Sequence, residues 1–478
     1  MSTFNHHGMK AMPQLAHMCA HRSLSEERIG RFGRIFHGHA PLFLNPKTLI
    51  ELGKKSGPMD GGTTDDLTQA VPLGMVYFGQ FIDHDITLDT TSSFGRNNQP
   101  GEIENFRTPS LDLDCIFGEG PEDEPFLYEA DSLRLLTGAT NNNLGQGQNT
   151  EKHDLPRNGE GRALIGDPRN DENRIVSQLQ LAFIRFYNEL YNDVAAAHPD
   201  YDAKEVYEEA RRLTTWHYQW IVVNEFLPVM CGEVVVDRIL GQGRTAYQPC
   251  SRAYIPVEFS VGSYRFGHSM ITQKVQLNNG GSTHDLFSNQ VGGGFSKITS
   301  QNQVIDWERF FDFDGTYQRA AKLDIHMAST LLELPFIQPP SSMSSLATRN
   351  LMRGQSFLLP SGETIARCLN RDEAEINQIK TFLKNATSGF DIDLDAGTPL
   401  WLYILAEAGE IGRQDKDGFK IAEGLGPVGA TLTAEVILAL LELDPNSYLG
   451  ANRNWQPDLG TDGVFTMKDL LEKSLDHV

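Results

Sequence analysis

Helical periodicity is the feature that most restricts the fold of this chain. Residues Asn173–Val194 carry apolar side chains at steps of three and four, which predicts an amphipathic helix of about six turns. Gly74–Thr87 and Glu205–Val229 have a similar spacing, and Pro228 is expected to end the second of these helices because proline removes a backbone donor. Thr431–Leu443 is apolar almost all round, which predicts a core helix. Strand-like segments are few and short, so the chain is predicted to be mainly α.

Composition excludes several classes of protein. The 478 residues include 63 Asp and Glu against 41 Lys and Arg, so the formal net charge is −22, which excludes binding to a phosphate backbone and hence to nucleic acid. Five cysteines without a C-x-x-C pair predict neither a disulfide framework nor a zinc site. No run reaches the roughly 18 apolar residues of a membrane span, and the N-terminus lacks a basic start followed by an apolar run. We therefore expect no membrane span and no Sec signal, which leaves the compartment open between the cytoplasm and leaderless secretion.

The segment Gly79–Asp85 (GQFIDHD) places two acids beside one histidine. On a helix, Gln80 and His84 are one turn apart and share a face. Asp83 lies next to that face, and Asp85 is turned by about 100° from His84. Two interpretations fit these residues alone: a buried histidine paired with carboxylates, or a cation site of the phosphohydrolase type.

The segment Gly166–Glu172 (GDPRNDE) directly precedes the long helix. On a structural interpretation, Asp171 caps this helix and Glu172 lies near its positive end. Arg169 has no such structural role. Pro168 restrains it near the helix start, and a guanidinium in that position favours contact with an anion or oxyanion.

The segment Ser263–Met270 (SYRFGHSM) carries a third candidate site. Arg265 and His268 are three residues apart, so both can face one ligand, and Gly267 leaves room for a flat group to approach. A lone histidine is more often structural, so this segment gains weight only if the other two segments converge on it.

Oxygen-bearing side chains recur at every second position of Thr108–Asp114 (TPSLDLD). In an extended segment they share one side. Hard oxygen donors in this number suit Ca²⁺, which takes six to eight of them. An edge strand with a polar outer face is the alternative.

In this order, these segments resemble the animal-type haem peroxidases of the peroxidase–cyclooxygenase superfamily, and in particular its bacterial members. Gly79–Asp85 resembles the distal motif, Gly166–Glu172 the catalytic-arginine motif and Tyr264–His268 the proximal motif. The resemblance continues through Arg349–Gly354 (RNLMRG) and Leu425–Ala430 (LGPVGA), and so covers nearly the whole chain.

The resemblance implies a fold and a function together. It implies a single large haem-centred helical domain with few short strands over residues 71–478, with residues 1–70 as an N-terminal arm that wraps the core. The implied enzyme is a peroxidase that reduces hydrogen peroxide and, through a ferryl intermediate, oxidises halide, thiocyanate or small phenolic and amine donors.

The resemblance also implies a role for each residue around haem b. His84 would be the distal base, Arg169 would stabilise charge as the O–O bond breaks, and Gln80 would hold distal water or halide. His268 would be the ligand of the haem iron, with Asn350 on its second ring nitrogen.

Four further residues would contact the haem, and five would bind calcium. Arg265 and Arg353 would pair with haem propionates, while Asp83 and Glu172 match the carboxylates that form ester bonds to haem in several family members. Asn173 stands where one mammalian member has a methionine for a third link, so that link should be absent. The implied calcium ligands are Asp85, Thr108, Ser110, Asp112 and Asp114.

Three other functions are weighed against the peroxidase. A fatty-acid dioxygenase of this superfamily needs a tyrosine three residues before the proximal histidine, where this chain has Arg265; Tyr264 is one residue off and should point elsewhere. A non-catalytic adhesion or structural protein on the same fold is disfavoured by the retention of His84, Arg169 and His268. A phosphohydrolase leaves the later motifs without a role.

Overall fold

The computed structural model describes residues 30, 32–89, 92–93, 96–130, 132–139, 151–250, 252–337, 343–461 and 463–475. The helices are α2 Pro46–Gly53, α3 Leu73–Ile86, α4 Asp114–Phe117, α5 Arg174–Ala197, α6 Ala203–Ile221, α7 Leu227–Cys231, α8 Glu233–Gln242, α9 Val257–Ser260, α10 Gly267–Met270, α11 Leu346–Ser356, α12 Gly362–Cys368, α13 Glu373–Ala386, α14 Leu400–Glu410, α15 Pro427–Glu442, α16 Tyr448–Ala451 and α17 Met467–Leu475. The strands are β1 Phe32–Gly33, β2 Leu67–Pro72, β3 Ile255–Pro256, β4 Lys274–Gln276, β5 Thr283–Asp285, β6 Arg319–Ala321, β7 Arg413–Asp415 and β8 Gly418–Lys420. The prediction of a mainly α fold with few short strands is confirmed.

The strands form two-stranded sheets and no larger layer within the described residues. β1 pairs with β3 in parallel, whereas β2 pairs with β6, β4 with β5 and β7 with β8 in antiparallel register. The β2–β6 pair joins segments far apart in the sequence and leads directly into α3. The short strands therefore pair connecting segments with one another, while the hydrophobic core is formed mainly by helices.

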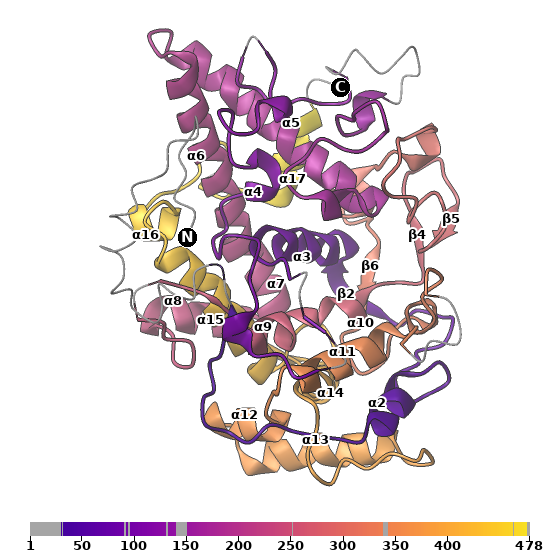
Figure 1. The fold of residues 1–478 in the computed structure, drawn as a ribbon. Coiled ribbons are helices and arrows are strands. Elements are labelled where there is room, and N and C mark those ends of the chain that lie inside the picture. The colour runs from indigo at the N-terminus through magenta and orange to yellow at the C-terminus, as the bar shows by residue number, and fades with distance from the viewer. Residues whose placement is uncertain are drawn as a thin grey trace.

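Helix α3 lies in the middle of the molecule (Figure 1), with α4, α5, α6 and α17 on one side and α9, α10, α11 and α14 on the other. Every residue of α3 is buried except Gln80 and Asp83, which are partly exposed. This explains why its sequence is apolar on most sides, since a helix that packs on all faces has no water-facing stripe. The polar residues of α3 contact defined partners instead: Gln80 contacts Glu172, Asp83 contacts Thr87 and His84 contacts Asn170.

Helix α5 begins as its sequence predicts, but with a different cap. The side chain of Asn173 accepts hydrogen bonds from the backbone N–H groups of Ile175 and Val176. The interpretation of Asp171 as the cap is therefore wrong. Asp171 is buried and accepts two hydrogen bonds from Arg157 instead, since a buried carboxylate gains more from a guanidinium partner than from backbone amides.

The expected helix end at Pro228 is also wrong. A π-helical turn, Val222–Phe226, follows α6 directly, and α7 then continues with Pro228 in its first turn. Proline is tolerated in a first turn because its missing N–H has no helical acceptor there. The wider π turn restarts the hydrogen-bond pattern just before Pro228.

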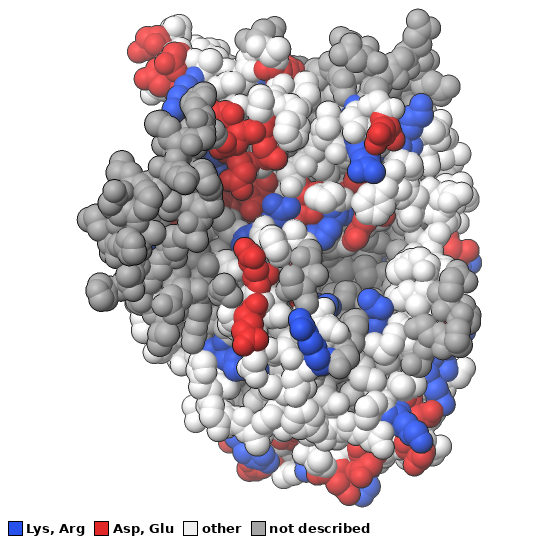
Figure 2. Space-filling model, viewed as in Figure 1, with Lys and Arg blue, Asp and Glu red and all other residues white. Residues whose placement is uncertain are grey.

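Buried apolar residues from Phe32 to Leu471 form one hydrophobic cluster. None of the helices among the described residues is both long and apolar enough to cross a membrane. Acidic side chains gather on the face shown in Figure 2, over the region between α4 and α6, as expected from the charge of −22.

Residues 1–29 and 31 of the predicted N-terminal arm, which include Cys19, lie outside the described residues, as do residues 140–150. The described part of the arm packs on distant elements, with α2 against α11. The buried carboxylate of Glu258 accepts hydrogen bonds from the backbone N–H groups of Ile35 and Phe36 at 3.0 and 3.1 Å.

Candidate active site

A cavity of about 720 Å³ lies between α3, α10 and the start of α5. Its walls include six of the residues that the sequence singled out: Gln80, Asp83, His84, Glu172, Arg265 and His268. Apolar side chains such as Phe226 and Leu331 line much of the remainder. The volume lies within the range of about 300–1,000 Å³ that is usual for small-molecule and cofactor sites.

Helix α3 supplies one wall of the cavity because Gln80 and His84 are one helical turn apart, as predicted. The side-chain amide of Gln80 donates a hydrogen bond to the carboxylate of Glu172. Asp83 also lines the cavity, and one of its carboxylate oxygens accepts from the hydroxyl of Thr87 at 2.9 Å. Two carboxylates therefore reach the cavity from different elements.

His84 is 6% exposed, and its Nδ1 atom lies 2.7 Å from Oδ1 of Asn170. Burial lowers the pKa of His84, and the nearby charge of Arg169 lowers it further, against the opposing effect of Asp83. The neutral imidazole is thus favoured, which is the form that can accept a proton.

Arg169 lies beside His84 but is not among the residues that line the cavity. It belongs to the 3₁₀ turn Pro168–Asp171, and its Nη2 atom donates to the backbone carbonyl of His84 at 2.9 Å. The fully buried carboxylate of Asp167 accepts from the backbone N–H, Nε and Nη2 of the same arginine. The positive charge is therefore held rigidly next to the histidine.

His268 lines the cavity from α10, and its Nδ1 atom lies 2.8 Å from the side-chain amide of Asn350 on α11. Arg265 donates to Oδ1 of Asn350 at 3.3 Å. Burial lowers the pKa of His268 to about 3, and the charge of Arg265 contributes. With Nδ2 of Asn350 on Nδ1, the ring would carry its hydrogen on Nε2. Turning the amide of Asn350 over places its Oδ1 on Nδ1–H and leaves the lone pair of Nε2 for a metal, and in that orientation these residues fit a haem iron.

Tyr264 lines the cavity too, so the expectation that it points elsewhere is wrong. The consecutive residues Tyr264–His268 all contribute to the wall, which means that the cavity runs along this segment rather than facing one side of it. The hydroxyl of Tyr264 donates to the backbone carbonyl of Gly79 at 3.2 Å.

Burial raises the pKa of Glu172 to about 7, against the opposing charge of Arg169. Arg353 is not among the lining residues; its guanidinium donates to Ser92 and lies 3.8 Å from Asp89. Burial lowers the pKa of Arg265 to about 10, and the charge of Arg353 contributes.

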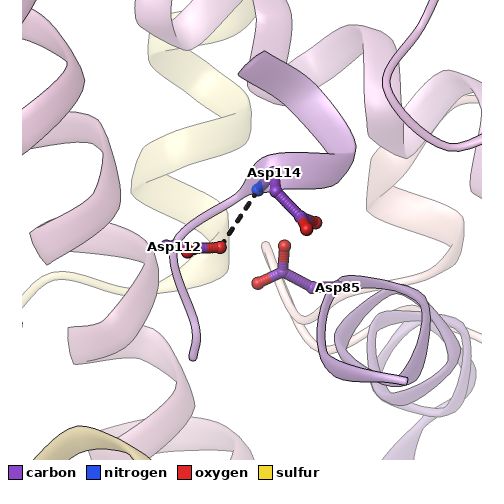
Figure 3. Close-up of side chains that lie close together, drawn as sticks. All are labelled: Asp85, Asp112 and Asp114. Atoms are coloured by element: carbon purple, nitrogen blue, oxygen red, sulfur yellow. Dashed lines mark hydrogen bonds between the residues drawn. The ribbon is translucent and has the colours of Figure 1, made fainter. Parts of the chain in front are cut away.

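On the other side of α3, the carboxylates of Asp85, Asp112 and Asp114 converge (Figure 3). One oxygen of each lies within 4.8 Å of the others. Oδ1 of Asp85 and Oδ1 of Asp114 are buried and accept no hydrogen bond from the described part of the chain. Burial and the neighbouring charge of Asp112 together raise the pKa of Asp114 to about 7, against the opposing charge of Arg107. A hard divalent cation fits this arrangement because it would relieve the repulsion and fill the free oxygens.

The segment around these carboxylates is not an extended strand. Thr108 donates its hydroxyl to Asp112 at 2.8 Å, whereas Ser110 makes no hydrogen bond within the cluster among the described residues. Leu113 adopts a left-handed conformation with φ 58°, and α4 begins at Asp114. The edge-strand alternative is therefore wrong, because the turn at Leu113 redirects the chain so that carboxylates from loop and helix meet.

A model of the family described as animal haem peroxidase matches residues 89–388, well over half of the chain. The chain belongs to the animal haem peroxidase family. Membership implies a haem group as cofactor. The match begins just after α3, so the placement of Gln80, Asp83 and His84 rests on the geometry of the cavity itself.

Similarity to curated peroxidases is low in identity and partial in length. Chorion peroxidase from Aedes aegypti is 26% identical over 201 residues, which are 40% of this chain and 25% of that protein. Peroxinectin A from Dictyostelium discoideum is 25% identical over 248 residues, which are 48% of this chain and 43% of that protein. The chain thus spans less than half the length of these relatives.

Solved structures share the fold over nearly the whole chain. Peroxidase A from Dictyostelium discoideum has a TM-score of 0.63 at 17% identity and covers 93% of both chains. Fatty acid alpha-dioxygenase from Oryza sativa has a TM-score of 0.54 at 14% identity, covering 94% of this chain and 85% of that one. The peroxidase fold therefore includes the residues on both sides of the family match.

Four residues around the site had no role on sequence grounds: Arg107, Asp167, Asn170 and Gln180. Asp167 and Asn170 lie within two residues of Arg169 in the sequence. That closeness to a predicted catalytic residue could have marked both as candidates. Arg107 lies 60 residues from its partner Asp167. No local pattern connects such residues.

Proposed function

We propose that this protein is a haem peroxidase that reduces hydrogen peroxide and oxidises small donors. The observation that carries the proposal is the cavity that brings His84 and His268 together, each with an amide on its Nδ1 atom. His268 would bind the haem iron, with Asn350 and Arg265 behind it. When bound, haem supplies the redox chemistry that accepts oxidising equivalents from the peroxide.

On the side of the cavity formed by α3, His84 would transfer the proton and Arg169 would stabilise the developing charge. Nε2 of the neutral His84 would take a proton from one oxygen of the peroxide and return it to the oxygen that leaves as water. Arg169 does not line the cavity, so it would act through its positive charge beside His84, which Asp167 holds in a fixed position, and so stabilise the negative charge that develops on the leaving oxygen. Gln80 would hold water or a small anion one turn before the histidine.

Asp83 and Glu172 would be the carboxylates that attach haem through ester bonds. Both line the cavity, and Gln80 orients Glu172. Acid-acetone extraction tests this proposal directly: after peroxide treatment, haem should stay with the wild-type protein and be released from a double variant with Asp83→Asn and Glu172→Gln. Complete release from the wild type would contradict it.

The calcium site would comprise Asp85, Asp112, Asp114 and Thr108, with Ser110 as a further ligand through its backbone or hydroxyl. The carboxylates carry this proposal, since three acids converge and two of them, Asp85 and Asp114, have a buried oxygen without a hydrogen-bond donor among the described residues, an arrangement that a counter-cation would satisfy. Asp85 follows His84 on α3, so the ion would brace the distal helix from behind.

Donors would be halide, thiocyanate and small phenols or amines. Phe295 and Phe336 line the cavity and are 65% and 68% exposed, which places aromatic surface at its mouth and supports aromatic donors. Gln80 and ester-linked haem would favour iodide and thiocyanate. A screen of donors with peroxide measures this preference.

The decisive experiment combines an absorption spectrum with one variant. The purified protein should show the Soret band of bound haem; its absence after expression with haem supplied would contradict the proposal. Substitution His84→Ala should slow the reaction with peroxide by about 10²-fold or more while the Soret band remains, since a general base contributes about that factor. The matched control is His326→Ala, an exposed histidine that does not line the cavity.

A fatty-acid dioxygenase is the second candidate, and one observation favours it. Tyr264 lines the cavity next to Arg265, and the fatty acid alpha-dioxygenase from Oryza sativa shares the fold. Oxygen consumption with palmitate would support this candidate, and its loss in Tyr264→Phe would assign the tyrosine. Peroxide-dependent donor oxidation without any fatty-acid turnover would exclude it.

A further inference from the structure

Behind His84, a line of buried amides runs away from the cavity. Oδ1 of Asn170 lies 2.7 Å from Nδ1 of His84, and Nδ2 of Asn170 donates to Oε1 of Gln180 at 2.7 Å. Nε2 of Gln180 in turn donates to the backbone carbonyl of Cys115 at 3.0 Å. Asn170, Gln180 and Cys115 are each 0% exposed, so water does not compete for these bonds.

The direction of every bond in this line follows from its last member. A backbone carbonyl can only accept, so the group of Gln180 that faces Cys115 must be its NH₂ group. Oε1 of Gln180 then faces Asn170 and accepts from its NH₂ group, which turns Oδ1 of Asn170 toward the histidine. Because an amide oxygen also only accepts, Nδ1 of His84 must carry a hydrogen.

We propose that Gln180 is a positioning residue that sets the tautomer of His84, so that Nδ1 is protonated and Nε2 presents its lone pair to the cavity. Gln180 acts through Asn170 and does not reach the cavity itself. The tautomer of a neutral histidine is determined by the hydrogen bond on its other nitrogen, and only the lone pair on Nε2 can accept a proton from a ligand in the cavity. The catalytic part of this inference rests on the proposed peroxidase function, whereas the tautomer itself does not.

The alternative arrangement shows why Gln180 matters. If the amide of Asn170 turned over, its NH₂ group would face Nδ1 of His84, and Nδ1 would have to accept. The hydrogen would then move to Nε2, where it would block the base. In the native protein this turn would also place two amide oxygens opposite each other, Oδ1 of Asn170 against Oε1 of Gln180, which is unfavourable in a buried site.

The test needs a variant that breaks the line and a matched control. Gln180→Met removes both amide bonds and keeps the length of the side chain. Gln178→Met is the control, because Gln178 is also buried on α5 and also makes two long-range bonds, donating to Gln303 and accepting from Ile305, but neither reaches His84. Gln180→Glu is the conservative variant, since a protonated carboxyl group can accept from Asn170 and donate to Cys115.

The tautomer is read by nuclear magnetic resonance on protein labelled with ¹⁵N in its histidine rings, in the diamagnetic ferrous carbonyl form where haem is bound. The signals of His84 are those missing from His84→Gln. The wild type, Gln178→Met and Gln180→Glu should show hydrogen on Nδ1 alone, whereas Gln180→Met should show a mixture with hydrogen on Nε2. The proposal is overturned if the wild type carries hydrogen on Nε2, or if Gln180→Met and Gln178→Met give the same tautomer.

A rate measurement provides the second readout. The reaction with peroxide should slow by about tenfold in Gln180→Met, the lower end of what loss of a supporting hydrogen bond behind a functional histidine costs, and by less than about twofold in Gln178→Met. If Gln180→Met does not fold, Asn170→Leu removes the same acceptor from His84 and should give the mixed tautomer. If Gln180→Met gives the mixed tautomer but the wild type itself has no peroxidase activity, the proposed function is contradicted and the assignment of Gln180 stands.

Discussion

Nη2 of Arg169 lies 2.7 Å from a carboxylate oxygen of Asp167, and this same carboxylate also accepts from Arg107. Arg107 in turn lies 3.6 Å from Asp114 in the carboxylate cluster. One buried acid therefore joins the arginine beside His84 to the segment that we propose for calcium. Burial alone would raise the pKa of Asp167, but the hydrogen bonds and positive charges of Arg169 and Arg107 outweigh burial and lower it.

Substitution Asp167→Asn should impair both stability and the reaction with peroxide. Removing one partner of a buried ion pair leaves an unpaired charge and costs about 3–5 kcal/mol of unfolding free energy. Arg169 would also lose its fixed position, and a displacement of about 1 Å costs up to about 10²-fold in rate. Denaturant unfolding and stopped-flow mixing with peroxide measure the two effects.

The matched control for Asp167 is Asp171→Asn. Asp171 is buried four residues later and pairs with Arg157 at 2.7 Å instead of with Arg169. It should cost similar stability with a smaller loss of rate. Equal losses of rate in the two variants would mean that the rate reports only general loosening of the fold.

Removal of calcium should lower both the melting temperature and the activity. If the ion binds the folded state alone, it adds about 2.7 kcal/mol at a free concentration 100 times its Kd. The substitution Asp112→Asn should weaken this calcium-dependent stabilisation, and the exposed Asp391→Asn should not. A fully calcium-stripped sample with unchanged melting temperature and turnover would refute the site.

The aromatic side chains at the mouth of the cavity should determine the affinity for phenolic donors. The ring of Phe336 lies 6.0 Å from that of Phe287, edge to face, and both line the cavity. Phe336→Ala should raise KM for phenols several-fold and leave iodide oxidation nearly unchanged, because a small anion gains little from an aromatic surface. Phe419→Ala, at an exposed phenylalanine on β8, is the control. An equal change for iodide and phenols would contradict this role.

Local spacing predicted the parts of the site that lie on one element. Gln80 and His84 share a face because α3 is a regular helix, whereas Arg265 and His268 both reach the cavity because the whole segment Tyr264–His268 runs along its wall. The first relationship depends only on helical geometry. Of the predicted catalytic and haem-binding residues, Gln80, Asp83, His84, Glu172, Arg265 and His268 line the cavity, whereas Arg169, Asn350 and Arg353 do not.

Relationships that depend on packing between distant elements were not predictable in this way. Asn170 contacts Gln180 because the 3₁₀ turn packs against α5, and Gln180 reaches Cys115 only because α4 packs on α5. Pro228 and Leu113 were misjudged for a related reason, since a π turn and a left-handed residue each change the direction of the chain at a single point.

Stability should fall with rising pH because of Glu407, which is fully buried in α14. Its carboxyl group accepts from the backbone N–H groups of Val428 and Gly429 at the start of α15. Burial raises the pKa of Glu407 to about 8, and Glu375 contributes against the opposing charge of Arg371. The folded protein thus keeps a proton that the unfolded chain releases near its ordinary pKa of 4.5.

Between about pH 4.5 and pH 8 the folded state binds more protons at Glu407 than the unfolded state. The free energy of unfolding should therefore be highest below this window and decrease by about 1.4 kcal/mol per pH unit across it from this residue. Glu407→Gln is neutral at every pH and can still accept from Val428, so it should remove that slope. Urea unfolding of both proteins from pH 5 to pH 8 measures the difference, and parallel stability curves would show that Glu407 does not hold the proton.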